Sequence, residues 1–355
     1  MKGKLLSKVW PGCFIRLFAA FMAATASCLT MAAEVGLMQW SFKYYDENVP
    51  VSVWFPTTHA AIDINAGPFT PRAATGVAVQ QREHPLVIIS HGTGGSGIAH
   101  HTIAEALASG GYLVAAMNHP GDNYQDRSLV ADERYFIERP RQIQAMLHAI
   151  TSDEKLASVI DQSRIGAIGH SAGGYAVAVA LGAQPDRKGL IEHCSKTGDD
   201  PSCRYRDPAL GVTSPRGQPF TLPAETTPLN YAADSKIRSA VLMAPLGSVI
   251  SAASRINPDV PVRIIVAESD EILPHQYHLA RLEKVAPHAT TQLVPGAGHF
   301  SFISPVNEQW RDQLGEVAID PPGFDRVEFH RTLGRDLREW FDESLKRVIY
   351  ETVNR

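Results

Sequence analysis

Residues 164–173 read Arg-Ile-Gly-Ala-Ile-Gly-His-Ser-Ala-Gly, and this stretch decides the fold. Its last five residues fit the pattern Gly-x-Ser-x-Gly, in which a serine occupies a sharp turn between a strand and a helix. An apolar strand-like run precedes the pattern, and residues 173–182 continue as an apolar, alanine-rich segment typical of a helix. Because glycine neighbours leave room for an exposed hydroxyl, the pattern predicts that Ser171 is a nucleophile.

The chain on both sides of this turn alternates between strands and helices. A first strand, half-exposed, is predicted at 51–55, and buried strands at 86–89, 112–116, 165–168, 237–244, 262–267 and 291–294. Helices are predicted at 98–109, from Pro140 onward, at 173–182 and, as an amphipathic terminal helix, at 327–349. This alternation predicts an α/β domain over residues 34–355, with a mostly parallel, doubly wound sheet.

Residues 185–235 interrupt the alternation. They are rich in proline and glycine, show no sustained apolar period and contain Cys194 and Cys203. Loops of this length without their own structure are uncommon in compact domains and often act as lids or binding loops. We therefore expect an irregular, lid-like insertion.

The first 33 residues predict a signal peptide. Four basic residues between positions 2 and 16 precede an apolar run at 17–24, which is followed by small residues. We expect cleavage after Ala26 or Ala33 and export to the periplasm or the medium. A membrane anchor is the alternative, but polar residues interrupt the stretch, whereas a spanning helix needs about 20 apolar residues in succession. Cleavage before Cys28, as in a lipoprotein, is a third option, but residues 25–27 match the pattern of such cleavage sites poorly.

The charge balance excludes one class of partner. Loss of residues 1–33 removes four positive charges and no negative ones, so the formal net charge changes from −4 to −8. Nucleic-acid binding calls for a basic stripe, and the mature chain has no run of lysine or arginine. We therefore expect no nucleic-acid partner, and no stable membrane span after cleavage.

Two cysteines remain if cleavage follows Ala33. Export to an oxidising compartment favours a disulfide between Cys194 and Cys203, and two free thiols are the alternative. Two cysteines alone lack the further ligands that zinc requires. The adjacent His100 and His101 face different directions on a helix, so we predict no metal site.

A serine hydroxyl is a weak nucleophile and needs a histidine base that is held by a carboxylate. In this motif's setting the chain order is serine, acid, histidine. His299 follows the last predicted strand in a glycine-rich segment, and Asp270 follows the strand at 262–267, where catalytic groups gather in open α/β sheets. The sequence therefore predicts a triad of Ser171, Asp270 and His299.

Neighbouring candidates fit less well. His288 precedes the last strand and His330 lies within the terminal helix, so we expect a solvated and a packing histidine. Glu268 and Glu271 flank Asp270, and we expect both to be solvated loop charges. The segment 119–122 follows a strand, and either a place at the site's rim or a structural turn fits it.

An oxyanion requires backbone donors that are fixed in advance. Residues 90–95 read Ser-His-Gly-Thr-Gly-Gly after a strand, which is the loop that supplies one donor. We expect the amides of Thr93 and Ala172 to form this oxyanion hole. The same glycines could form an ordinary turn; a phosphate-binding loop would need a following Gly-Lys-Ser/Thr, which is absent from the sequence.

Four motifs together resemble the exported dienelactone-hydrolase-like esterases of the α/β-hydrolase superfamily: residues 90–94, 118–121, 169–174 and 298–302. The chain is also similar to the secreted platelet-activating-factor acetylhydrolases, over about residues 35–345. The resemblance implies an α/β-hydrolase fold and a cofactor-free hydrolase of small carboxylic esters, with Ser171, Asp270 and His299 in the triad positions.

The sequence departs from both groups. True dienelactone hydrolases have a cysteine nucleophile where this chain has Ser171, which argues against dienelactone as the substrate. The acetylhydrolases carry their acid after the preceding strand, where residues 244–246 read Ala-Pro-Leu. The expected function is serine ester hydrolysis through an acyl-enzyme. A peptidase or polyester hydrolase on the same fold and a non-catalytic binding module are the alternatives.

Overall fold

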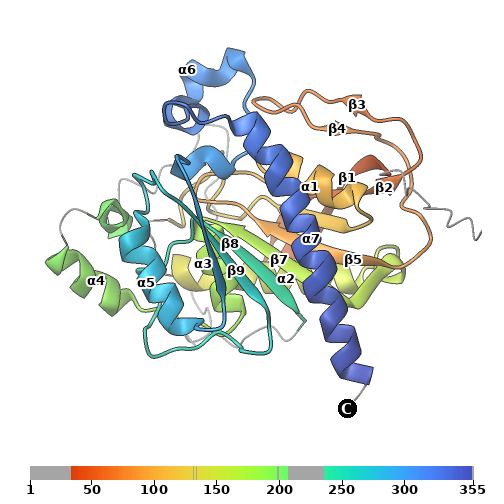
Figure 1. The fold of residues 1–355 in the computed structure, drawn as a ribbon. Helices are drawn as coiled ribbons and strands as arrows, with labels where there is room; N and C mark the ends of the chain where they lie inside the picture. Colours follow the sequence, from red (N-terminus) through yellow and green to blue (C-terminus); the bar gives the residue numbers. More distant parts are fainter. Residues whose placement is uncertain (1–32, 131, 133, 198–199, 207–235, 354–355) are drawn as a thin grey trace, which may run out of the picture. The chain divides into compact units, whose positions relative to one another are not determined.

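A computed structural model describes residues 33–130, 132, 134–197, 200–206 and 236–353 (Figure 1). The predicted signal peptide lies outside these residues, except for Ala33. Among the helices of the described part, none combines the length and the apolar character needed to cross a lipid bilayer.

An eight-stranded sheet forms the centre of the fold, in the order β1-β2-β6-β5-β7-β8-β9-β10. The strands are β1 Glu34–Tyr44, β2 Glu47–Thr57, β5 His84–Ser90, β6 Leu113–Met117, β7 Ile160–His170, β8 Ser239–Met243, β9 Val262–Ala267 and β10 Thr290–Val294. Pairing is antiparallel from β1 to β2 and from β2 to β6, and parallel from β6 to β10. The short strands β3 Ile62–Asp63 and β4 Arg72–Ala73 form a separate pair. The predicted mostly parallel sheet is confirmed.

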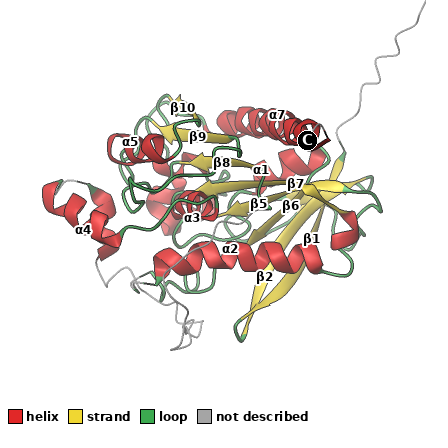
Figure 2. Ribbon diagram, turned by 90° about the horizontal axis from the view of Figure 1, so that it is seen from below, coloured by secondary structure: helices red, strands yellow, loops and turns green. Residues whose placement is uncertain are grey.

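Helices cover both faces of the sheet. The main helices are α1 His101–Ser109, α2 Tyr135–Ser152, α3 Ala172–Ala180, α5 His275–Val285 and α7 Arg326–Val353, with a short α6 at Arg311–Leu314. Figure 2 shows α1 and α7 on one side of the sheet and α2 and α3 on the other. In β5, Leu86 and Ile88 join the core beneath α2 and α3, and Val87 and Ile89 join the core beneath α1 and α7. Burial on both faces explains the continuous apolar runs of the parallel strands.

The antiparallel end of the sheet differs from the prediction. The sheet begins at β1, which the sequence analysis left unassigned, and β1 pairs with β2 along its whole length. The predicted half-exposed strand at 51–55 is buried on both faces, because Val53 and Phe55 enter one core and Trp54 enters the other. The alternation therefore separates two cores instead of a core from solvent.

Helix α2 begins five residues before the predicted start at Pro140. A proline inside a helix cannot donate to the carbonyl four residues earlier, which here belongs to Phe136. That carbonyl accepts a hydrogen bond of 2.7 Å from the hydroxyl of Tyr175 on α3. A tertiary contact thus compensates for the proline, which is why the sequence alone placed the helix start too late.

The predicted irregular insertion contains a helix, α4 Arg187–Lys196, whose first turn is capped by the Asp186 carboxylate. A second helix that the sequence analysis missed, α5, lies between β9 and β10. Cys194 on α4 forms the expected disulfide with Cys203, in the 3-10 turn Pro201–Arg206. Residues 207–235 of the insertion lie outside the described part.

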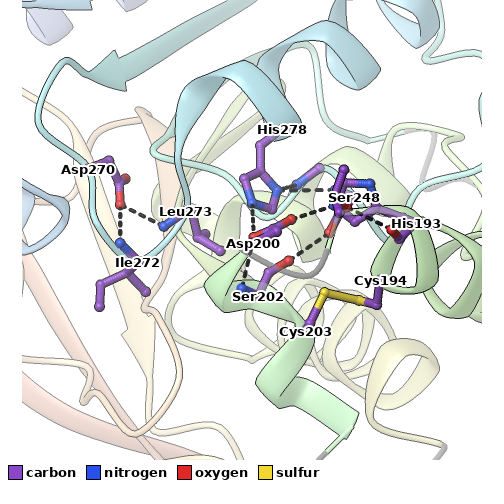
Figure 3. A network of polar contacts seen from close by, with 12 residues as sticks. His193, Cys194, Asp200, Ser202, Cys203, Ser248, Asp270, Ile272, Leu273 and His278 are labelled. Carbon is purple, nitrogen blue, oxygen red and sulfur yellow. Dashed lines mark hydrogen bonds and ion pairs between the residues drawn. A yellow bond between two sulfur atoms is a disulfide. The ribbon is translucent and has the colours of Figure 1, made fainter.

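A buried carboxylate joins this part of the insertion to α5 (Figure 3). Oδ2 of Asp200 accepts a hydrogen bond from His193 on α4. Oδ1 accepts from the backbone N–H of Ser202 and lies 3.6 Å from Nε2 of His278 on α5. Burial opposes ionisation, but these partners outweigh it and lower the pKa of Asp200 well below its usual value. The carboxylate therefore stays charged at neutral pH.

We expect the disulfide to stabilise the insertion locally. On the chain-entropy model, a loop of about ten residues contributes roughly 2 to 3 kcal/mol. In a Cys194→Ser, Cys203→Ser variant, hydrogen exchange should accelerate in α4 and in the turn Pro201–Arg206, while amides of β5 and β7 keep their protection. Ser195→Ala, an exposed change on the same helix, is the control. Equal acceleration in the sheet and the insertion would contradict this expectation.

Candidate active site

Ser171 occupies a strained turn between β7 and α3. Its backbone angles are φ 57° and ψ −119°, in a region that residues with a side chain rarely adopt. Such strain costs about 1 to 3 kcal/mol and persists only where the surroundings impose it. The Ser171 N–H donates to Met243 at the end of β8, and its carbonyl accepts from Leu246 and Tyr175. The hydroxyl is thereby held at the carboxyl edge of the parallel strands.

The two motif glycines permit this close packing. A Cβ on Gly173 would lie 2.0 Å from the carbonyl oxygen of Ser90 on β5. A Cβ on Gly169 would lie 2.2 Å from the carbonyl oxygen of Gly173. Both obstacles are backbone atoms, which cannot rotate away. The requirement for small neighbours, inferred from the sequence, therefore has a direct steric cause.

The three predicted triad residues lie in one hydrogen-bonded chain. Oγ of Ser171 lies 3.0 Å from Nε2 of His299, and Nδ1 of His299 lies 2.8 Å from Oδ2 of Asp270. All three side chains are buried. Because a carboxylate only accepts, Nδ1 carries the imidazole proton, and Nε2 is left to accept the serine proton. This is the tautomer that a histidine base requires.

The loop after β9 aims Asp270 at the histidine. Oδ1 of Asp270 accepts from the backbone N–H groups of Ile272, at 2.9 Å, and Leu273, at 2.7 Å (Figure 3). Burial would raise the pKa of this carboxyl. The interaction with His299 and the two backbone donors outweigh burial, so the pKa of Asp270 is lowered. One oxygen thus anchors the side chain, and the other orients His299.

His170, between the motif glycine and Ser171, supports the histidine from beneath. Its Nε2 donates to the carbonyl oxygen of His299 at 3.0 Å, and the two rings lie 5.0 Å apart. Burial and the neighbouring His299 lower the pKa of His170 to about 3, so its ring is neutral. The sequence analysis assigned no role to His170. The motif allows any residue at this position, so the sequence did not indicate that His170 contacts His299.

The two predicted oxyanion donors come from two different segments of the chain. Ala172 is the first residue of α3, and the first N–H groups of a helix have no acceptor within it. Thr93 lies in the loop after β5, next to Gly92, where a Cβ would lie 3.1 Å from Cβ of Ser171. The loop backbone therefore packs directly on the candidate nucleophile.

The remaining candidates lie apart from this chain of residues. His288 bonds to the carbonyl of Val260. His330 is buried between the Thr102 hydroxyl and the carbonyl of Ser301.

The two glutamates that flank Asp270 are exposed, and the Glu268 carboxylate accepts a hydrogen bond from the Gly296 N–H. The segment 119–122 is structural, because His119 and Asp122 are both fully buried beneath the loop at 90–95.

One group in the described residues has the spacing of metal ligands: His193, Asp200 and Cys203. The sulfur of Cys203 is part of the disulfide, so it is not a thiolate ligand. Nδ1 of the adjacent His278 accepts from the N–H groups of residues 247–248. Its Nε2 therefore carries the proton of the neutral ring and faces Asp200 as a donor. This donor set fits a hydrogen-bonded cluster better than a metal site.

Comparisons with known proteins agree with this fold. The sequence profile of the alpha/beta hydrolase family matches residues 86–314. A ferulic acid esterase from Streptomyces cinnamoneus superposes with a TM-score of 0.59 at 17% identity, covering 91% of this chain and 92% of that chain. A carboxylesterase from Lactobacillus plantarum superposes with a TM-score of 0.49 at 15% identity. The match covers 86% of this chain and 97% of that chain. No curated protein matches the sequence significantly. At such identities the first structure shows a shared fold alone.

The packing at Gly173 predicts that a substitution at this position lowers the stability of the fold. Gly173→Ala should cost about 1 to 3 kcal/mol of stability, because the added methyl group meets an immovable carbonyl oxygen. Gly110→Ala is the matched control, since its methyl group would meet the flexible side chain of Arg338 at 2.3 Å. Thermal unfolding of both variants measures the difference. Equal melting temperatures for the two variants would refute the steric argument.

Proposed function

Because the chain belongs to the alpha/beta hydrolase family, we propose that it hydrolyses carboxylic esters with Ser171 as nucleophile, His299 as base and Asp270 as the orienting acid. The hydrogen-bonded chain from Asp270 to His299 to Ser171 is the observation that carries this proposal. Geometry of this kind, with a neutral imidazole between a buried carboxylate and a hydroxyl, activates serine for attack on a carbonyl.

In the proposed reaction, Oγ of Ser171 attacks the ester carbonyl carbon as Nε2 of His299 takes its proton. The carbonyl π electrons move to oxygen, and the amides of Thr93 and Ala172 donate to this oxyanion. Collapse of the tetrahedral intermediate expels the alcohol, which takes the proton from His299. Water, activated by the same histidine, then releases the acid and restores Ser171.

The carboxylate of Asp270 stabilises the imidazolium that forms in each step and keeps its ring oriented. No step requires a cofactor or a metal. The substrate we propose is a small-molecule ester. The basic and apolar N-terminal segment extends the proposal to a periplasmic or secreted enzyme whose mature chain begins at Ser27 or at Glu34.

Two alternatives define what the experiments must separate. A peptidase or polyester hydrolase would use the same three residues on an amide or a polymer. A binding module would keep the fold without turnover, and such modules typically lose a triad residue. The complete set Ser171, Asp270 and His299 favours an enzyme.

The proposal predicts covalent labelling of Ser171. A fluorophosphonate probe should label the mature protein on this residue, and Ser171→Ala should abolish both labelling and ester hydrolysis without changing the melting temperature. A panel of esters of increasing acyl length, compared with peptide amides and a polyester film, identifies the substrate class. A folded protein that neither reacts with the probe nor hydrolyses any panel member would leave the binding-module alternative.

A second prediction distinguishes the acid from its neighbours. Asp270→Asn keeps an oxygen that can accept from Ile272 and Leu273, but it loses the carboxylate that selects the histidine tautomer. We expect kcat to fall by about 10⁴, by analogy with serine proteases. Glu268→Gln and Glu271→Gln are the matched controls and should change kcat little. The assignment is wrong if Asp270→Asn turns over normally while one of the glutamine variants is inactive.

A further inference from the structure

A buried polar network lies behind the loop at residues 90–95. Three of its members, Tyr135, Arg139 and Gln142, are spaced four and three apart on α2, so they share one face of the helix. Asp122, from the segment after β6, completes the group. All four side chains are fully buried. This face of α2 is therefore polar although it is not accessible to solvent.

An ion pair in this network binds the loop backbone. Nη1 of Arg139 lies 3.0 Å from Oδ2 of Asp122, and both side chains are 0% exposed. Oδ1 of Asp122 accepts from the N–H of Gly94 at 2.7 Å. Nη2 of Arg139 donates to the carbonyl oxygen of His91. The pair thus holds the backbone on both sides of residues 92–93.

A hydroxyl relay fixes the Thr93 side chain. The Tyr135 hydroxyl donates its only proton to Oδ2 of Asp122, at 2.9 Å. The Thr93 hydroxyl, 2.9 Å from the same tyrosine oxygen, must therefore be the donor in that bond. The orientation of Thr93 consequently depends on the acceptor oxygen of Asp122.

Two neutral histidines hold the rest of the loop. His119 lies between the Ser90 hydroxyl, at 2.9 Å, and the Gln142 carbonyl oxygen, at 2.8 Å. His91 Nδ1 donates to the Gly92 carbonyl at 2.7 Å. Burial, followed by the positive charge of Arg139, lowers the pKa of both rings, that of His91 to about 3. Each residue from 90 to 94 therefore has a defined partner.

A buried ion pair is a costly way to stabilise a fold, because apolar residues of similar volume often serve as well. This pair contacts the loop at 90–95, whose Gly92 packs against Ser171. We propose that Arg139 and Asp122 are positioning residues, which hold the loop at 90–95 so that the Thr93 amide faces the developing oxyanion. The inference rests on the proposed function and adds a specific role for α2.

The expected effect on the rate follows from the need for preorganised donors. Loss of one oxyanion donor costs about 10² to 10³ in kcat, and a displacement of about 1 Å elsewhere in a site costs about 10². A loop that loses the ion pair but keeps its own sequence should lose less than this, so we expect a fall in kcat of at most about 10². Ground-state binding of the substrate does not use the oxyanion contact fully, so KM should change little.

The test uses Asp122→Asn, Arg139→Met and the double variant in the full mature protein. Each single change leaves one buried charge unpaired, so both stability and kcat should fall, with kcat reduced about 10- to 100-fold. The double change removes both charges, so the melting temperature should recover while kcat stays low.

An alkylboronic acid, whose oxygen occupies the oxyanion position on Ser171, should lose affinity in parallel with kcat/KM. Hydrogen exchange at residues 92–95 should accelerate in all three variants.

Glu138→Gln is the matched control. Glu138 is adjacent to Arg139 on α2 and equally buried, but it contacts Tyr44 on β1 and Arg141 instead of the loop. We expect lower stability with unchanged kcat and unchanged exchange at 92–95.

Two outcomes would overturn the inference while leaving the proposed function intact. One is recovery of kcat together with stability in the double variant. The other is a loss of kcat in Arg139→Met no larger than that in Glu138→Gln. A native protein that is folded but inactive towards every ester and unlabelled at Ser171 overturns the proposed function, and the assigned role of α2 with it.

Discussion

The strained turn at Ser171 is the constraint on which the rest of the structure depends. A positive φ at a residue with a side chain must be imposed by its surroundings, and here the ends of three parallel strands impose it. β7 leads into the turn, β8 accepts its N–H, and the end of β5 lies against Gly173 with no room for a methyl group. The parallel pairing of β5 with β7 and of β7 with β8 keeps these strand ends in register. The backbone around Ser171 cannot relax, so the hydroxyl stays within 3.0 Å of Nε2 of His299.

Three buried carboxylates organise the loops around that turn, and each is held by donors of its own. Asp270 is anchored by two backbone N–H groups and orients His299. Asp122 pairs with Arg139 and reaches the loop at 90–95. Asp200 joins the disulfide-bonded part of the insertion to α5. A buried charge without partners is expensive, so each carboxylate fixes the positions of the groups that solvate it. Polar loops thereby acquire the rigidity that apolar packing gives to the sheet.

These loops are also linked to one another through the backbone. Leu246 donates to the carbonyl of Ser171, and the next two residues donate to His278 on α5. The helix α5 itself follows directly on the segment that anchors Asp270. The insertion, the acid loop and the nucleophile turn are therefore joined by polar contacts and short stretches of chain.

The sequence by itself determined the elements whose signal is local. Apolar runs set the strands β5 to β10, and the Gly-x-Ser-x-Gly pattern located the turn; chain order then selected Asp270 and His299, which the structure brings to Ser171. The hairpin of β1 and β2, the early start of α2 and the polar face formed by Tyr135, Arg139 and Gln142 were decided by tertiary structure. The physical reason is that apolar periodicity records burial along one segment, whereas a polar residue can be buried only when distant partners satisfy it. Such partners lie on other elements of the fold and leave no local pattern in the sequence. Tyr175 satisfies the Phe136 carbonyl, which Pro140 cannot bond, and Asp122 pairs with Arg139.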